Sequence, residues 1–429
     1  MEIIPVSHPL AATVRVPGSK SITNRALLLA ALADGPTQLT NALFADDTLT
    51  FAQSLCELGF EVSLDGCGAR MAVRGLGGRI PARKADIQVG NAGTAARFLT
   101  AFLALGQGEY RIDGEARMRE RPMADLVGAL RCLGVQIEQE SDRDGLPLRI
   151  RPGGLSGGRV RVSGDISSQF LSALLMIAPC AQGPLRIEVA GELTSRPYVD
   201  LTLATMADFG IQVSCSNNLR FEAQPGHYRA QAEYLVESDA SGASYFFAAA
   251  ALLGGTVRVE NLSRRSRQAD VAFLDVLGQM GCVVAAVGDS LEVTGPTPDR
   301  FGSPSLQGVD IDLRDLPDTA QTLSAIAPFA ASPTRIRGIA SARFKETDRI
   351  SATCAELTRL GVTVVEHADG MTIYPCATIC PASVRTYKDH RMAMAFSLIG
   401  LRVPGVTIEG PDCVAKTFPT FFKVLDTLR

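Results

Sequence analysis

Hydrophobic and polar positions follow the same order several times along the chain. An amphipathic helical pattern ends in an apolar residue, a glycine and another apolar residue at 58–60, 133–135, 209–211, 280–282 and 360–362. Successive glycines of this set are separated by 71 to 80 residues. Glycine adopts the left-handed conformation at low cost, so each position predicts that a helix ends and a strand follows. The chain is therefore predicted to consist of repeated units of roughly this length.

A polar cluster followed by an Ala- and Leu-rich helix is predicted to open each unit. The clusters are residues 19–23, 91–94, 167–169, 239–241, 315–318 and 388–391, and the last helix is expected to run through Leu398. Short alternating runs between the two helices of a unit predict strands, as at 110–113, 185–189, 256–259 and 406–409. A unit is thus helix, strand, helix, then one or two strands, and six such units fill the chain.

The two ends of the chain predict how the units combine. The sixth unit stops after a predicted helix at 417–428, whereas residues 2–6 and 12–16 are strand-like runs without a helix. We expect the N-terminus to complete the last unit. One predicted domain then comprises residues 1–17 and 236–429, with units four to six, and the inserted domain comprises residues 18–235. Two crossings between domains suggest a hinge.

Composition narrows the classes of function. The chain has 429 residues, 46% of them hydrophobic, which is enough apolar material for two or three cores. Its formal net charge of -3 disfavours nucleic acid as a partner. The longest apolar stretches, such as 170–181 and 245–253, fall short of the roughly 20 residues that a membrane span needs. The N-terminus shows no secretory or transit signal, so a cytoplasmic protein is expected.

Cysteine and histidine spacing argues against a metal site. The ten cysteines are scattered, and the four histidines lie far apart in the sequence. Free thiols in a reducing compartment fit this pattern, and a zinc site does not.

Cations and small polar residues gather where the first helices of the units should begin. Helix N-termini bind anions through free N–H groups and the helix dipole. The residues are Lys20, Ser21 and Arg25; Asn91, Gly93, Thr94 and Arg97; Ser167, Ser168 and Gln169; and His390 and Arg391. Ser, Asn and Asp are also ordinary N-caps, which is the alternative for any single cluster. If the units are equivalent, these helix ends would line a cleft between the domains.

Further cations lie in segments 117–122 and 343–349 and at Lys416. Segment 343–349 also contains Glu346 and Asp348, which could form plain helical ion pairs with their neighbours. The run 264–267 is expected to be a solvated surface. The residues alone therefore predict an anion-binding cleft that contains carboxylates, without identifying a reaction.

Seven motifs in one order carry a family resemblance that covers the whole chain. They are Pro17 to Arg25, Gly90 to Thr94, Arg117 to Pro122, Ser167 to Phe170, Lys345 to Arg349, Asp389 to Ala393 and Ala415 to Pro419. In these motifs the chain resembles the 3-phosphoshikimate 1-carboxyvinyltransferases, also called EPSP synthases. The resemblance implies an α/β fold of two inverse α/β domains, each of three βαβαββ repeat units, with the active site in the interdomain cleft.

The resemblance also implies a transferase of the shikimate pathway, which leads to the aromatic amino acids. The 5-hydroxyl of shikimate 3-phosphate adds to C2 of phosphoenolpyruvate, C3 is protonated, and the tetrahedral intermediate loses phosphate. No cofactor and no metal are implied, and a monomer is expected. Both substrates are anionic, so several fixed cations must offset their mutual repulsion. Guanidinium suits this role because its planar fork donates two hydrogen bonds to phosphate or carboxylate.

The family's functional positions transfer to matching residues here. The resemblance implies that shikimate 3-phosphate binds to Lys20, Ser21, Arg25, Ser167, Ser168, Gln169, Ser195, Tyr198, Asp318, Ser341 and Lys345. Phosphoenolpyruvate is implied to bind to Lys20, Asn91, Gly93, Thr94, Arg121, Gln169, Arg349, Arg391 and Lys416. Among catalytic residues, Asp318 is implied to take the 5-hydroxyl proton, while Glu346 and Lys20 are candidates for moving the proton at C3. His390 is either a catalytic helper or a structural residue beside Arg391.

Two positions depart from the family's usual residues. Phe98 stands where Pro is usual and is expected to affect the helix that begins at Gly93. Ser341 stands where Asn is usual, and its hydroxyl is shorter than a carboxamide. Gly93 is expected to leave space for phosphoenolpyruvate, and hence for its mimic glyphosate, because a Cβ would intrude on the small substrate.

Other functions remain as alternatives. The sister enzyme that transfers enolpyruvate to a UDP-sugar shares the architecture but lacks this set of motifs. A non-catalytic anion-binding protein of the same fold would have no need for Asp318 and Glu346. A P-loop protein is excluded, because the segment around Lys20 lacks the upstream glycine of that motif.

Overall fold

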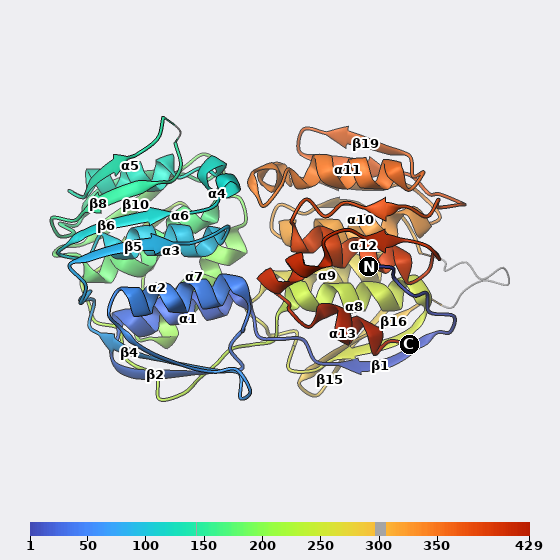
Figure 1. The fold of residues 1–429 in the computed structure, drawn as a ribbon, viewed down its shortest axis with the longest axis horizontal. Coiled ribbons are helices and arrows are strands. Elements are labelled where there is room, and N and C mark those ends of the chain that lie inside the picture. Colours follow the sequence, from blue (N-terminus) through green and yellow to red (C-terminus); the bar gives the residue numbers. More distant parts are fainter. Residues whose placement is uncertain (143, 297–305) are drawn as a thin grey trace. The chain divides into compact units, whose positions relative to one another are not determined.

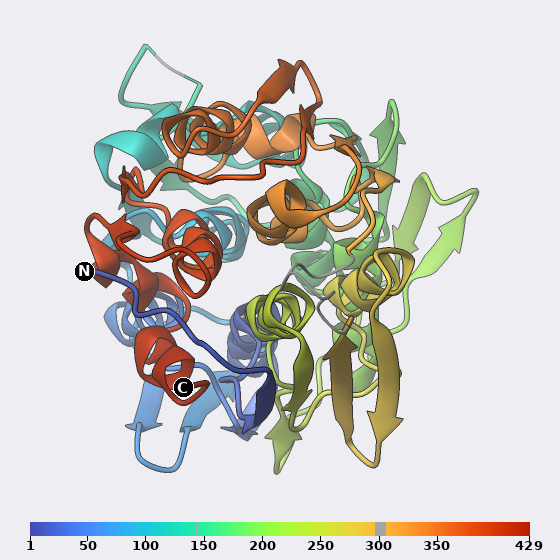
Figure 2. The same cartoon turned by 90° about the vertical axis from the view of Figure 1, so that its right-hand side faces the viewer.

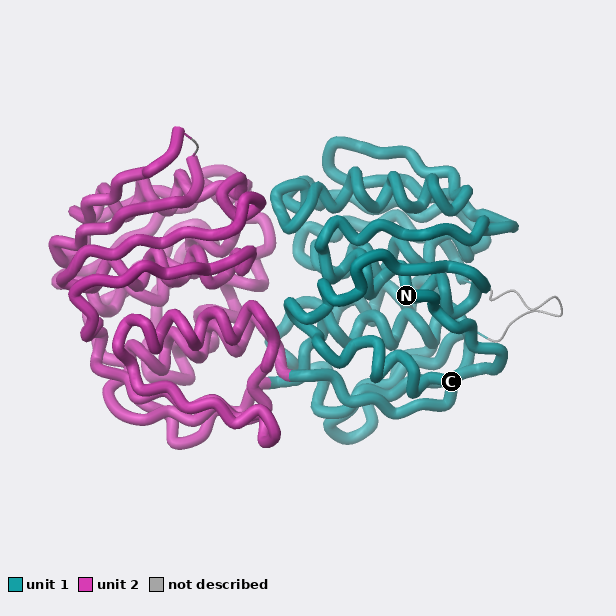
Figure 3. The backbone as a smooth tube through the Cα atoms, viewed as in Figure 1, with its two compact units in different colours: residues 1–17, 237–429 teal, residues 18–236 magenta. Residues whose placement is uncertain are grey.

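The computed structural model describes residues 1–142, 144–296 and 306–429. It contains two compact units, which Figure 3 shows in different colours. Unit 1 comprises Met1–Pro17 and Glu237–Arg429, and unit 2 comprises Gly18–Val236. Each unit has its own hydrophobic core.

Each repeat of unit 2 forms a sheet in which two parallel strands are extended by an antiparallel pair (Figure 1). The order in the first sheet is β13 (Tyr234–Leu235), β2 (Asp34–Thr40), β4 (Arg70–Leu76), β3 (Glu61–Asp65). In the second it is β5 (Lys84–Gln88), β6 (Glu109–Asp113), β8 (Leu148–Arg151), β7 (Gln136–Gln139). In the third it is β9 (Gly158–Ser163), β10 (Leu185–Ala190), β12 (Arg220–Ala223), β11 (Ser214–Ser216).

Two kinds of helix accompany the sheets of unit 2. The first helices of the repeats are buried on nearly every side: α1 (Lys20–Leu32), α3 (Gly93–Leu103) and α6 (Ser168–Ile177). The second helices bury one face: α2 (Asp46–Glu57), α5 (Ala124–Cys132) and α7 (Arg196–Asp208). A short helix, α4 (Ala116–Glu120), lies between β6 and α5. Because α3 packs against both α1 and α6, the first helices form the centre of the unit.

Unit 1 repeats the four-stranded plan in two of its sheets, and its third sheet is a parallel pair. Its sheets are β1 (Leu10–Val14), β14 (Gly255–Val259), β16 (Ser290–Gly295), β15 (Val283–Val287); then β17 (Asp310–Asp312), β18 (Thr334–Arg337), β20 (Gly370–Ile373), β19 (Val364–His367); and the pair β21 (Ser383–Val384), β22 (Thr407–Ile408). The buried first helices are α8 (Ala240–Leu253), α10 (Ala320–Ile326) and α12 (His390–Gly400), which pack on one another. The second helices are α9 (Phe273–Gln279), α11 (Arg349–Arg359) and α13 (Phe421–Asp426).

The N-terminal segment corrects one expectation. We expected both N-terminal runs to complete the last repeat, but β1 pairs in parallel with β14 of the fourth repeat (Figure 2). Only the first few residues reach the sixth repeat, where Glu2 forms a bridge with Thr407. The reason is that β13, which precedes α8 in the sequence, pairs with β2 in unit 2. The fourth repeat therefore takes its first strand from the N-terminus.

The predicted ends of the second helices are confirmed. Gly59, Gly134, Gly210, Gly281 and Gly361 each have φ between +82° and +102°. The predicted starts of the first helices are confirmed as well, within two residues except at 315–318, where a short 3₁₀ turn (Pro317–Thr319) precedes α10. The last predicted helix, 417–428, is shorter, since α13 begins only after Pro419. Among the described residues, none of the helices combines the length and the apolar character that a membrane span requires.

Candidate functional site

A cluster of charged side chains in unit 1 centres on Arg349, the first residue of α11. Its guanidinium donates from Nε to Asp389 Oδ2 at 2.7 Å, from Nη1 to Asp318 Oδ1 at 3.1 Å and from Nη2 to Glu346 Oε2 at 2.7 Å. Burial opposes the charge, but these carboxylates together raise the pKa of Arg349 above its usual value. One cation thus holds three carboxylates in fixed positions.

Asp318 also contacts a second guanidinium. Arg391 Nη2 donates to Asp318 Oδ2 at 2.7 Å, and its Nη1 donates to the Asp318 carbonyl at 3.1 Å. Tyr245 of α8 lies 3.4 Å from the same Nη1. Tyr245 is in the second turn of α8, Asp318 is in the 3₁₀ turn before α10, and Arg391 is in the first turn of α12, so three elements of unit 1 meet at these side chains. Asp318 keeps 20% of its side chain exposed, so part of it remains accessible to a substrate.

Glu346 lies between two cations. Besides Arg349, Lys416 Nζ lies 3.9 Å from Glu346 Oε1. Both side chains are at least nine-tenths buried. The pairing of Glu346 with Arg349 has helical spacing, but Glu346 precedes the first turn of α11, so it is not an ordinary ion pair along a helix face.

His390 is fully buried at the start of α12. Its Nδ1 lies 3.6 Å from Asp389 Oδ1, longer than a hydrogen bond. Asp389 caps α12 by accepting a hydrogen bond from the Arg391 amide at 2.9 Å. The burial of the imidazole favours the structural interpretation of His390.

In unit 2, Arg25 is a buried cation held by uncharged groups. It donates to Thr202 Oγ1 at 2.8 Å, to the Ser21 carbonyl at 2.9 Å and to the Tyr198 carbonyl at 3.0 Å. Burial lowers the pKa of Arg25 to about 10, so it remains a cation at neutral pH. Among the residues that the structure describes, its hydrogen-bond partners are uncharged, so Arg25 is suited to bind an anion that supplies an opposite charge.

Gly93 makes space for the guanidinium of Arg121. A Cβ at Gly93 would lie 2.3 Å from Arg121 Nη2. The same guanidinium lies 3.4 Å from the Asn91 carbonyl and 3.5 Å from its side-chain oxygen. The sequence predicted that Gly93 leaves space for a substrate. The structure adds that the guanidinium of Arg121 occupies the position next to Gly93. Arg97 fixes this arrangement by donating to the Gly93 and Pro122 carbonyls.

The remaining predicted residues of unit 2 begin helices. Lys20 pairs with the buried Asp47 at 3.1 Å. Ser167 caps α6 by accepting from the Gln169 amide, and the Gln169 side chain donates to Thr94 Oγ1 at 3.3 Å, which joins the starts of α6 and α3. Their neighbours on these helix starts are Ser21, Ser168, Ser195 and Tyr198. Ser195, the residue before α7, has the left-handed φ of +55°.

Two predicted residues of unit 1 lie beside its cluster. Ser341 is on the 3₁₀ turn Ala340–Phe344, and Lys345 directly follows that turn, both half-buried. The basic run 264–267 is largely exposed, as predicted. Among the described residues, no group of three or more His, Cys, Asp or Glu side chains is arranged to hold a metal ion.

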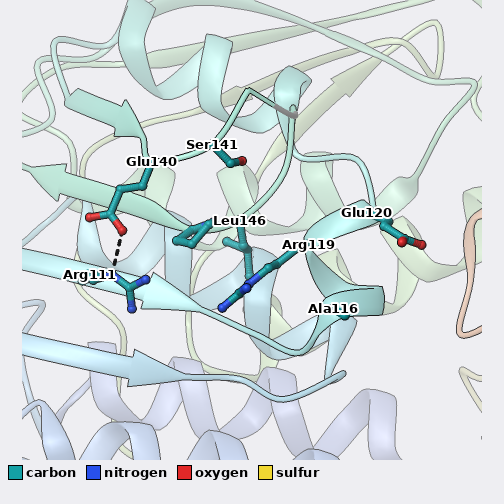
Figure 4. A pocket seen from close by; sticks show the side chains of 8 residues that line it. Arg111, Ala116, Arg119, Glu120, Glu140, Ser141 and Leu146 are labelled. Atoms are coloured by element: carbon teal, nitrogen blue, oxygen red, sulfur yellow. Dashed lines mark hydrogen bonds and ion pairs between the residues drawn. The ribbon is translucent and has the colours of Figure 1, made fainter.

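A surface pocket of about 600 Å³ in unit 2 contains none of the predicted site residues (Figure 4). Arg111 and Arg119 line it, and both donate to Asp113, while Arg111 also pairs with Glu140 at 2.7 Å. Because carboxylates neutralise both arginines, this pocket is not suited to bind a further anion.

Sequence reasoning missed several contacts of the predicted residues. Asp47, Thr202 and Tyr245 contact Lys20, Arg25 and Arg391 across the fold. Acidic residues at a helix start and Thr or Tyr in a buried helix are ordinary, so the sequence carries no signal for them. Asp389 could have been identified, since it stands directly before His390 and Arg391 at a predicted helix start.

Comparisons with known proteins show which family this chain resembles over its length. The family model described as EPSP synthase (3-phosphoshikimate 1-carboxyvinyltransferase) matches residues 5–425. A relative from Nostoc sp., named 3-phosphoshikimate 1-carboxyvinyltransferase, is 51% identical over 425 residues, which are 98% of each chain. An EPSP synthase structure from Acinetobacter baumannii has a TM-score of 0.80 and 25% identity, and the match covers 100% of this chain and 97% of that one. The enolpyruvyl transferase NikO from Streptomyces tendae has a TM-score of 0.79 at 18% identity over 100% of this chain and 96% of its own, which shows a shared fold alone. The chain belongs to the EPSP synthase family, that of the 3-phosphoshikimate 1-carboxyvinyltransferases.

Proposed function

We propose that the protein transfers the enolpyruvyl group of phosphoenolpyruvate to the 5-hydroxyl of shikimate 3-phosphate and releases phosphate. Its place would be the shikimate pathway of aromatic amino acid biosynthesis. The observation that carries the proposal is the binding of Asp318 and Glu346 by the one guanidinium of Arg349. Acid–base chemistry on an anionic substrate needs carboxylates and cations side by side, and this cluster supplies both.

We propose that different cations bind the two substrates. Arg25, with the helix starts that carry Ser167 and Gln169, would bind the phosphate of shikimate 3-phosphate, because the partners it has among the described residues are uncharged. Arg121, Arg349, Arg391 and Lys416 would bind the phosphate and carboxylate of phosphoenolpyruvate. Arginine forks suit both groups because each presents two oxygens in a plane.

The exposed edge of Asp318 would take the proton of the 5-hydroxyl as its oxygen attacks C2. Glu346 or Lys20 would deliver a proton to C3, and the reverse transfer from C3 would accompany loss of phosphate. Glu346 lies buried beside Arg349 and Lys416, two of the cations that are proposed to bind phosphoenolpyruvate, so it would lie near the substrate. His390 is proposed as a structural residue.

Separate measurements of binding and turnover test the assignment of Asp318. Replacing Asp318→Asn removes a base but keeps the size of the side chain, so phosphate release should fall by about 10²- to 10⁴-fold. Calorimetry should still detect binding of shikimate 3-phosphate. A variant that retains turnover within a few-fold of wild type would contradict the assignment.

Phosphate release with different acceptors tests the substrate. Shikimate 3-phosphate should support turnover, and UDP-N-acetylglucosamine should not. The UDP-sugar alternative is not favoured, since relatives that match almost the whole chain bear the carboxyvinyltransferase name. Turnover with the UDP-sugar alone would contradict the proposal.

The same proposal includes a cytoplasmic monomer whose domains close on the substrates. Each of the ten cysteines is a free thiol, as suits a reducing compartment. Substrate anions that bind cations from both units would draw the units together and exclude water. Light scattering gives the mass of the particle, and small-angle scattering should show compaction on addition of shikimate 3-phosphate.

A further inference from the structure

A strained turn precedes the helix that carries Arg391. Tyr387 and Lys388 have φ of +54° and +57°, the left-handed region that side chains with a Cβ disfavour. Two such residues in succession persist only where the surrounding structure holds them, and strain of this kind gathers at functional sites. The next residue is Asp389, which binds Arg349.

Glu356 holds this turn from α11. Its side chain is fully buried, and its carboxylate accepts from Tyr387 Oη at 2.7 Å, from the Arg385 amide at 3.0 Å and from Arg359 Nε at 3.0 Å. Burying a carboxylate is costly unless its oxygens accept hydrogen bonds. These three hydrogen bonds therefore explain how Glu356 can be buried here. Burial and the bond to Glu356 raise the pKa of Tyr387 to about 12, so the phenol stays a donor at neutral pH.

The turn is connected directly to the cations of the candidate site. The Asp389 amide donates to the Thr386 carbonyl at 2.8 Å, which closes the turn. The Asp389 carboxylate accepts from Arg349 Nε at 2.7 Å and from the Arg391 amide at 2.9 Å. Any shift of the turn would therefore move the groups that orient both arginines.

Helix α11 contacts this segment at two points. Arg349 and Glu356 are seven residues apart, about two helical turns, and so lie on the same face of α11. Arg349 binds Asp389 through its guanidinium, and Glu356 binds Tyr387 through its carboxylate. Two contacts from one rigid helix fix both the position and the direction of the segment between them.

We propose that Glu356 and Tyr387 are positioning residues for the reaction: they hold the strained turn so that Asp389 orients Arg349 and Arg391 for phosphoenolpyruvate. Neither residue would touch substrate. The inference rests on the proposed function, because it names the substrate that the two arginines bind.

The variant Tyr387→Phe removes the hydroxyl and keeps the ring. We expect the KM for phosphoenolpyruvate to rise about tenfold, the cost of one hydrogen bond to a charged group, while the KM for shikimate 3-phosphate changes less than twofold. Tyr374→Phe is the matched control, since both tyrosine residues are 38% exposed. It should leave both constants unchanged. A role in stability alone would lower the melting temperature without separating the two KM values.

A second change makes the test specific for strain. Glycine adopts positive φ at low cost, so adding Lys388→Gly to Tyr387→Phe should restore part of the lost affinity for phosphoenolpyruvate. Hydrogen exchange of peptides spanning residues 385–392, without substrates, should be faster in Tyr387→Phe than in wild type and slower again in the double variant.

The outcomes separate the two proposals. An unchanged KM for phosphoenolpyruvate in Tyr387→Phe, or an equal rise of both KM values, would overturn the positioning role, even if exchange is faster. If the wild type releases no phosphate, the proposed function fails. In that case hydrogen exchange of residues 385–392 in Tyr387→Phe still tests whether Glu356 and Tyr387 hold the turn before Asp389. An exchange rate equal to that of wild type would overturn this role too.

Discussion

The guanidinium of Arg25 lies over the ring of Phe98, 5.3 Å from its centroid. This contact joins α1 to α3 inside unit 2 and gives Phe98 a role that the sequence did not predict. The sequence predicted an effect on the helix that begins at Gly93, and the structure adds a contact of the Phe98 ring with the guanidinium of Arg25. Phe98 therefore acts on the proposed shikimate 3-phosphate site.

The variant Phe98→Leu should weaken binding of shikimate 3-phosphate. A cation–π contact contributes from about 0.5 kcal/mol at exposed sites to about 2 kcal/mol when desolvated, which corresponds to a rise in KM of roughly 2- to 30-fold. Phe102→Leu is the control, because Phe102 is equally buried on the same helix but packs on Phe60. Steady-state kinetics with saturating phosphoenolpyruvate measure both. Equal changes in the two variants would assign the effect to packing.

The variant Gly93→Ala should displace Arg121 rather than unfold the protein. The new Cβ would meet the far end of a flexible side chain at 2.3 Å, so the guanidinium can move. Loss of its hydrogen bonds to an anion, about 1.5 to 3 kcal/mol, should raise the KM for phosphoenolpyruvate roughly 10- to 100-fold. Gly128→Ala on α5 is the control, since nothing lies within 4 Å of its Cβ. A normal KM in Gly93→Ala would contradict the placement of Arg121 at the substrate.

Glyphosate gives an independent test of the same space. As a mimic of phosphoenolpyruvate, it should inhibit the wild type in competition with that substrate and should inhibit Gly93→Ala less. An inhibition curve that shows no effect at millimolar glyphosate would reject this prediction.

Asp270 should make the stability of unit 1 depend on pH. Burial, and secondly the negative charge of Asp318, raise the pKa of Asp270 to about 7. A hydrogen bond from the Ser241 hydroxyl and the positive charge of Arg391 lower this pKa, but by less. The ordinary value is near 3.9, so the folded state favours the protonated carboxyl. Its contribution to stability is complete below about pH 4 and is lost as the pH rises to 7.

The variant Asp270→Asn should remove that loss. Its melting temperature should fall less than that of wild type between pH 5 and pH 8, as calorimetry can measure. Asp275→Asn is the control, because Asp275 pairs with Arg264 at the surface and its side chain is 63% exposed. Parallel pH profiles for wild type and Asp270→Asn would show that Asp270 is ionised throughout this range.

The repeats could be predicted from the sequence because their signals are local. A glycine after an amphipathic helix requires positive φ, and a polar cap before an apolar run starts a helix, so both are visible within a few residues. The pairing of β1 with β14 and of β13 with β2 could not be predicted, because each pair joins segments that lie far apart in the sequence. Pairing of a short strand with a distant partner depends on tertiary packing.

In the candidate site, too, local signals could be predicted and distant contacts could not. The cations were found by motif, but their partners were not, since Arg349 binds Asp389 and Arg391 binds Asp318 across 40 and 73 residues of sequence. The role of Glu356 was equally hidden, because a Glu in the middle of a helix is usually solvated. Only its burial and its bond to Tyr387 distinguish it.

A continuous assay for inorganic phosphate, with both substrates present and with each omitted in turn, tests the account most directly. Arg349 with its carboxylates is proposed to serve an addition to phosphoenolpyruvate, so phosphate should appear only when shikimate 3-phosphate is also present. Release from phosphoenolpyruvate alone, or no release with both substrates, would contradict it.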